Sequence, residues 1–159
     1  RPPPRKAAVV PYVKERVLAA VVASVFFIIA CATPAMRVAT VGYQGTPGHE
    51  KDMSGFELLL NGWMGAWSMN FGWYANPLFA IALLLLLVGA DRKALWVGTF
   101  AALVGLSSLT WFVQPLPSGS TSLAKLVYPS MGFVCWMLSL SSVPLTALEL
   151  SSRHKASAT

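Results

Sequence analysis

The chain has 159 residues, of which 55% are hydrophobic and only 11% are charged, and its formal net charge is +6. A soluble globular domain carries about 25% charged residues, so this composition argues against an ordinary soluble domain and predicts a membrane protein. The cations lie beside apolar segments and form no basic stripe on a polar domain, so we expect no nucleic-acid partner.

Four apolar segments follow one another along the chain, and each matches the roughly 20 residues of a membrane-crossing helix. They are residues 17–36, 73–90, 95–113 and 127–150. The chain is thereby divided into a Pro/Arg-rich tail at 1–16, a four-span domain at 17–150 and a short tail at 151–159. The expected fold class is all-α, an integral membrane four-helix bundle.

The cations predict how this bundle is oriented. Residues 89–94 are the only link between the second and third spans, so these spans form a tight antiparallel hairpin. The hairpin turn and both chain ends then share one face, which carries Arg1, Arg5, Lys6, Lys14, Arg16, Arg92, Lys93, Arg153 and Lys155; the other face carries Arg37, Lys51 and Lys125. By the positive-inside rule, we expect both termini in the cytoplasm.

The second span opens on an Asn-Pro pair. Asn76 is a favourable N-cap, because its side chain can accept a backbone N–H from the first helical turn. Pro77 at the first helical position loses a donor that would be unpaired in any case. We therefore expect this pair to start a helix.

The segment before this pair is also expected to be helical. Ser54 and Glu57 form a capping-box pattern ahead of three leucines, which predicts a helix over about 55–70. This helix is too apolar for a free loop and too interrupted to span a membrane, so we expect an outer-leaflet interfacial or re-entrant helix. The alternative is an outward extension of the second span.

Apart from Glu149, next to the end of the fourth, the spans contain no charged residue and no histidine, which argues against a proton path, a voltage sensor or an in-membrane haem ligand. Outside them, His49, Glu50 and Asp52 lie close together, but they lack the spacing that places two imidazoles on one metal ion. We interpret them as a solvated outer loop and expect no metal site, cofactor or catalytic group. A bound lipid or pigment would leave no motif. Cys31 and Cys135 are expected to be packed free thiols.

Two features of the third and fourth spans bear on packing. Gly98, Ala102 and Gly105 follow a small-residue spacing that lets another helix approach closely, either within the chain or from a partner. Pro144 cannot donate to the carbonyl of Leu140, so we expect a kink there, with nearby serine hydroxyls serving the freed carbonyl.

The run "GFELLLNGW" followed by "FGWYANPL" resembles a pattern of small multi-pass inner-membrane proteins of bacteria. In that pattern a G-W element precedes W-x-A-N-P-L and a Leu-rich helix. Its positions here are Gly62, Trp63, Trp73, Ala75, Asn76, Pro77 and Leu78. The resemblance covers about 55–93 and implies a bacterial inner-membrane protein. It brings no activity with it, so no catalytic residue is transferred.

These observations favour a non-catalytic accessory or assembly subunit of a larger bacterial inner-membrane complex. Its partners would be membrane lipids and other integral membrane subunits. The expected contacts are an outer docking patch and the helix stripe: Trp63, Trp67, Trp73, Tyr74, Gly98, Ala102 and Gly105.

Two other classes of function remain. The first is a homo-oligomeric channel or small-solute transporter with a re-entrant segment, whose polar residues would be Asn61, Asn70 and Asn76. The second is a membrane enzyme that uses His49, Glu50 and Asp52 at the outer surface.

Overall fold

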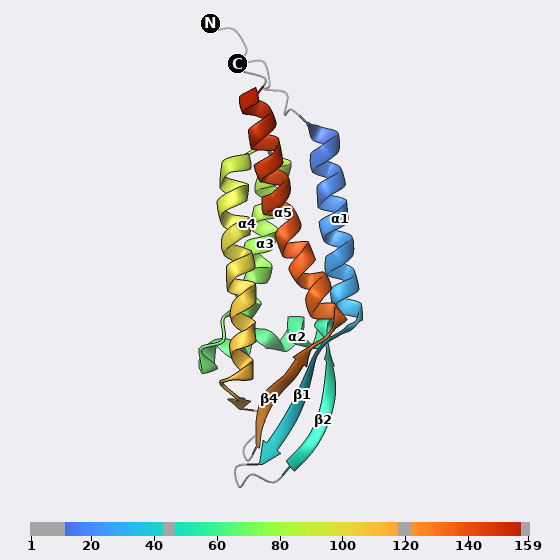
Figure 1. Cartoon of the computed structure of the whole chain (residues 1–159), viewed down its shortest axis with the longest axis vertical. Coiled ribbons are helices and arrows are strands. Elements are labelled where there is room, and N and C mark those ends of the chain that lie inside the picture. Colours follow the sequence, from blue (N-terminus) through green and yellow to red (C-terminus); the bar gives the residue numbers. More distant parts are fainter. Residues whose placement is uncertain (1–11, 43–46, 118–121, 157–159) are drawn as a thin grey trace, which may run out of the picture.

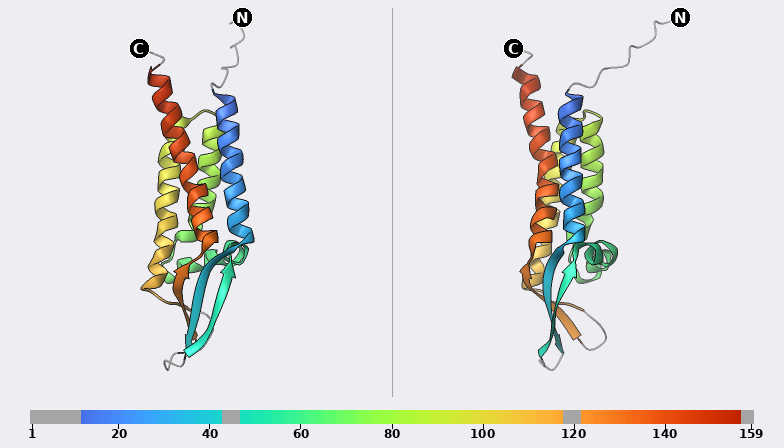
Figure 2. Two further views of the ribbon diagram at one scale, coloured as in Figure 1. Left: turned by 45° about the vertical axis from the view of Figure 1, so that its right-hand side comes forward. Right: turned by 90° about the vertical axis from the view of Figure 1, so that its right-hand side faces the viewer.

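The computed structural model describes residues 12–42, 47–117 and 122–156, and it is mostly helical. Four helices lie side by side along the length of the molecule, with a small sheet at one end (Figure 1). They are α1 (Val13–Ala32), α3 (Ala75–Leu87), α4 (Asp91–Leu106) and α5 (Met131–Ala156). We call the end with the sheet the sheet end. At the other, the turn end, α1 begins, α5 ends and α3 turns into α4 (Figure 2).

Three helical segments are long and apolar enough to cross a membrane, namely Val13–Ala32, Asp91–Phe112 and Met131–His154. The second of these segments ends in a 3-10 helix, η3 (Ser107–Phe112). The apolar helix at Gly72–Leu87 is shorter, at the place of the expected span 73–90. Residues 1–11 and 157–159 of the expected tails lie outside the described residues.

The expectation of an all-α fold is wrong at the sheet end. Four antiparallel strands form a sheet in the order β2-β1-β4-β3. They are β1 (Pro34–Gly42), β2 (Pro47–Ser54), β3 (Leu116–Pro117) and β4 (Ser122–Pro129). Parts of β1 and β4 belong to the expected first and fourth spans, because their apolar residues extend the helical runs in sequence. Their alternation places Met36, Val38 and Leu126 in a buried cluster with Trp111 and Phe133.

The segment after β2 runs across the bundle at its sheet end (Figure 2). The expected helix 55–70 is α-helical only in α2 (Gly55–Asn61), and it continues as a 3-10 helix, η1 (Gly62–Ser68). The capping box is present: the backbone N–H of Glu57 donates to Ser54 Oγ at 3.1 Å, and the backbone N–H of Ser54 donates to Glu57 Oε2 at 3.0 Å. A second 3-10 turn, η2 (Gly72–Tyr74), leads into α3.

Asn76 does not cap this helix, contrary to expectation. α3 begins at Ala75, and Tyr74 before it makes no side-chain cap. The Asn76 carboxamide oxygen instead accepts a hydrogen bond from Trp136 Nε1 of α5 at 2.9 Å. Pro77 lies in the first turn. The backbone N–H groups there have no partner within the helix, so proline removes no helical hydrogen bond.

The small-residue stripe of α4 packs against α5 within the chain. A Cβ on Gly98 would come within 2.9 Å of Pro144 Cδ, and a Cβ on Gly105 within 2.7 Å of Leu140 Cδ1. Ala102 is partly buried against the same core. A side chain at position 98 would therefore clash with the rigid ring of Pro144, whereas at position 105 the flexible Leu140 side chain could move aside.

Pro144 lies inside α5, but the nearby serines do not serve the carbonyl of Leu140 as expected. The Ser139 hydroxyl is fully buried and donates to the carbonyl of Ala23 in α1 at 2.8 Å. The Ser142 hydroxyl donates to the carbonyl of Ser139 at 2.7 Å. Ser139 thus joins α5 to α1. The two cysteines are free, as expected.

A buried ion pair holds the turn end together. Arg16 of α1 is 1% exposed and forms a two-pronged pair with Asp91, at the start of α4, in which Nη2 donates to Oδ2 at 2.8 Å and Nη1 donates to Oδ1. Nη1 also donates to the carbonyl of Leu86, near the end of α3, at 2.7 Å. His154 of α5 places Nε2 3.9 Å from the same carboxylate. Gly89 has a φ of 84°, which allows the tight turn between α3 and α4.

We expect Asp91→Ala to lower the free energy of unfolding by about 3–5 kcal/mol, because it leaves a buried guanidinium without its counter-charge. The paired replacement Arg16→Met with Asp91→Leu should recover most of this loss. Thermal denaturation of the purified protein measures both effects.

The control is Glu149→Ala, which removes an exposed partner of Arg153 on α5 and should cost at most about 1 kcal/mol. An Asp91→Ala variant as stable as this control would show that the buried pair does not hold the turn end.

Candidate functional site

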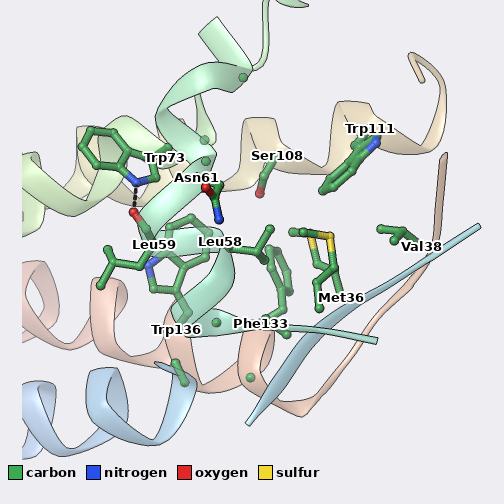
Figure 3. Close-up of a pocket in the computed structure, with 18 of the residues that line it drawn as sticks. Met36, Val38, Leu58, Leu59, Asn61, Trp73, Ser108, Trp111, Phe133 and Trp136 are labelled. Carbon is green, nitrogen blue, oxygen red and sulfur yellow. Dashed lines mark hydrogen bonds between the residues drawn. The ribbon is translucent and has the colours of Figure 1, made fainter. Parts of the chain in front are cut away.

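A cavity of about 360 Å³ lies where the bundle meets the sheet (Figure 3). Its walls come from the last turns of α1, the inner face of the sheet, the segment from α2 to η2, and the sheet-end parts of α3, η3 and α5. Most of the lining is apolar, including Met36, Val38, Leu58 and Phe133. Its volume falls in the lower part of the range of small-molecule sites, which is about 300–1,000 Å³.

Three tryptophans form aromatic walls of this cavity, and each indole N–H is already used by the protein. Trp73 donates to the carbonyl of Leu59 at 2.7 Å, and Trp111 donates to the carbonyl of Ala124 at 2.8 Å. Trp136 donates to Asn76, as described above. These bonds fix the three rings in place.

The polar residues of the lining include three carboxamides, those of Asn61, Asn70 and Asn76, together with Thr40, Lys51 and Ser108. Asn61 donates to the carbonyl of Glu57 at 3.0 Å, while Asn70 accepts from the backbone N–H of Gly72 at 3.2 Å. Within the described residues, the other half of each group has no protein partner: the oxygen of Asn61, and the NH₂ groups of Asn70 and Asn76. The asparagines considered for a pore thus lie around a cavity at one end of the bundle.

The structure separates the four aromatic residues of the expected docking patch. Trp73 faces the cavity, whereas Trp67 is 86% exposed and Trp63 is 48% exposed. Tyr74 is 39% exposed and packs edge-on against Trp73 with ring centroids 5.4 Å apart. Exposed apolar side chains gather around η1. We call this surface the η1 ledge; it comprises Trp63, Met64, Trp67, Met69 and Phe71.

The polar residues expected in an outer loop lie instead on β2. Glu50 and Asp52 sit on one face of this strand, and their carboxylate oxygens lie 2.9 and 3.9 Å from Nε of Arg37. Hydrogen bonds to Tyr128 and Glu50 raise the pKa of Arg37. His49 precedes Glu50 on the same strand. In the described ranges, no group of three His, Cys, Asp or Glu side chains is placed to hold a metal ion.

Sequence reasoning singled out Trp73 and the three asparagines separately, but it did not identify Trp111 or Trp136 and missed the cavity that unites these residues. The lining comes from residues more than 100 positions apart, and no local motif links them. The only local signal is the run of residues 58–90, which contains no charged side chain.

No known protein family matches the chain, and neither a curated protein nor a solved structure matches it.

α2 contributes one wall of the cavity. Its stability should depend on pH because Glu57 lies in its first turn. Lys51 Nζ donates to Glu57 Oε1 at 2.9 Å, and this bond, with that from the Ser54 backbone, lowers the pKa of Glu57. Ionised Glu57 therefore stabilises α2 fully above the ordinary glutamate pKa of about 4.3. The contribution is lost as the pH falls through the lowered value.

We expect the amide protons of α2 to lose protection against hydrogen exchange below about pH 4 in the natural protein. Glu57→Gln, which removes the charge, should show weaker protection with little pH dependence across that range. Equal pH dependence in both proteins would exclude Glu57 as the titrating group.

Proposed function

We propose that this chain is an integral membrane protein whose four helices cross the bacterial inner membrane. The distribution of side-chain sizes in the bundle supports this proposal. Its interior contains many small residues, and its surface carries large apolar ones. Fully buried positions include Ala23, Ala82, Ala94, Ala101 and Ala147, while Leu18, Ile28, Leu84, Trp96, Leu103 and Leu145 are each 60–66% exposed. Lipid would cover these large side chains, and small residues let spanning helices pack closely.

The charges support an orientation with the turn end in the cytoplasm. Lys14, Arg16, Arg92, Lys93 and Arg153 belong to the elements that meet there, whereas the strands of the sheet end carry Arg37, Lys51 and Lys125. The positive-inside rule places the more cationic end in the cytoplasm. The sheet, the cavity and the η1 ledge then lie on the outer side. The resemblance of residues 55–93 supports the bacterial inner membrane as the location.

We further propose that the chain is a non-catalytic accessory or assembly subunit that docks another integral membrane protein through the η1 ledge. The ledge is the observation that carries this role. It projects large apolar side chains beside the bundle, and neighbouring residues 58–90 carry no charge. Exposed patches of this kind are typical of interaction surfaces, and Trp is enriched among the residues that dominate binding.

The backbone of the ledge favours a protein partner over lipid alone. An ordinary amphipathic α-helix suffices to anchor a segment in the membrane interface. Here η1 is a seven-residue 3-10 helix, longer than the usual three or four residues, and it ends at Met69 with a φ of 59°. A side chain in this left-handed region costs energy, so the surface has a shape that is held at the expense of local stability.

We expect Trp67→Ala to weaken the complex with its partner by about thirtyfold or more, because a buried Trp anchor commonly contributes about 2 kcal/mol. A tagged chain would be purified from its native membranes in a gentle detergent. Native mass spectrometry of the intact particle then gives its composition.

The matched control is Trp96→Ala, which removes the same side chain from a 66% exposed position on α4. It should leave the particle intact. A particle that contains only this chain, or one that survives Trp67→Ala unchanged, would contradict the accessory role.

A further inference from the structure

We propose that the cavity at the sheet end binds a membrane-soluble molecule with an apolar chain and a neutral head that both donates and accepts hydrogen bonds. This inference rests on the proposed membrane insertion but does not need the accessory role. Its basis is the combination of fixed aromatic walls with carboxamides whose hydrogen-bonding capacity is half used.

The walls select an apolar ligand. All three indole N–H groups are bonded within the protein, so Trp73, Trp111 and Trp136 offer the cavity carbon surface. Leu58, Met36 and Phe133 project into the same space between them (Figure 3). A volume of about 360 Å³ is too small for a helix of a partner protein but suits one chain and a small head.

The carboxamides define the head. The oxygen of Asn76 is fixed by the indole of Trp136, so its NH₂ group is the free half, and the same holds for Asn70 because its oxygen accepts from Gly72. In Asn61 the NH₂ group is the bonded half, because it donates to the carbonyl of Glu57, and the oxygen is free. The three carboxamides therefore offer two donors for a ligand carbonyl or ether oxygen and one acceptor for a ligand hydroxyl.

The charge of the lining favours a neutral head. Lys51 is the only charged residue among those that line the described cavity, and its ammonium is already bonded to Glu57. An anionic head would find no unpaired cation there, and a cationic head would find no free carboxylate. The ester and hydroxyl groups of an acylglycerol meet these requirements, as do the hydroxyl and ether oxygens of an isoprenoid quinol.

The position of the cavity also suits a ligand that arrives from the bilayer. Its lining includes Phe27, Ala30 and Cys31, in the last turns of α1, and the cavity is partly open. In the proposed orientation these turns lie at the outer surface of the membrane. A chain could therefore extend toward the lipid while its head contacts the asparagines.

The test measures binding of two probes to the purified full-length protein by native mass spectrometry. Monooleoylglycerol represents the acylglycerols, and a decyl-substituted benzoquinol represents the quinols. We expect saturable binding of one molecule per chain for at least one probe. Preference for one of them identifies the source of the ligand, and equal binding supports the shared chemistry.

Two variants locate the site. Leu58→Trp fills the cavity and should weaken probe binding at least tenfold, whereas Leu60→Trp makes the same change on the same helix at a position that is 56% exposed and outside the lining. Asn61→Leu keeps the volume and removes the acceptor, so it should weaken binding by about fivefold to tenfold. It also provides a second test if Leu58→Trp does not fold.

Three outcomes would overturn the proposal. The first is that neither probe binds saturably. The second is that Leu58→Trp and Leu60→Trp bind equally well, which would place the probe elsewhere. The third is that Asn61→Leu binds both probes as tightly as the natural protein, which would show that Asn61 does not accept a hydrogen bond from the head, as the proposal requires. Loss of the protein partner in the Trp67→Ala experiment would affect none of these measurements.

Discussion

The arrangement of the bundle depends on the buried pair between Arg16 and Asp91. The guanidinium contacts the carboxylate at the start of α4 and the carbonyl of Leu86 near the end of α3, so one side chain of α1 holds both helices of the hairpin. A buried charge without its partner is costly, so a shift of α1 along the hairpin that separated the two groups would be strongly disfavoured. The pair therefore specifies the register of α1 against the hairpin more sharply than the surrounding leucines and alanines.

The register of α1 also affects the position of the sheet at the other end of the molecule, because the connections between helices and strands are short. Only Thr33 separates α1 from β1, and only Ser130 separates β4 from α5. The Ser139 hydroxyl also ties α5 to α1 inside the core. The positions of α1 and α5 consequently determine the position of the sheet. The shape of the cavity between the sheet and the bundle therefore depends on the register of these two helices. The three indole hydrogen bonds then complete its walls.

Much of the helical part was predictable because long apolar runs and a short charged turn have few other solutions. The capping box at Ser54 and Glu57 was found because its signal is local. The sheet was missed because β1 and β4 extend apolar helices without a break in hydrophobicity, although the alternation of Met36, Arg37 and Val38 was visible. Asn76 was assigned to a local cap, but it bonds a residue 60 positions away, and no local pattern predicts such a partner.

Together these features describe a bundle that carries an apolar ledge and a lined cavity at its sheet end. The claim on which the rest depends is that the turn end and the sheet end lie on opposite sides of a membrane. Cysteine accessibility tests it most directly, with single cysteines at Lys51, Lys93 and Lys125 in a chain that lacks Cys31 and Cys135. A membrane-impermeant maleimide added to sealed, inside-out vesicles should label only the cysteine at position 93. Labelling of all three positions, or of positions 51 and 125 alone, would contradict the account.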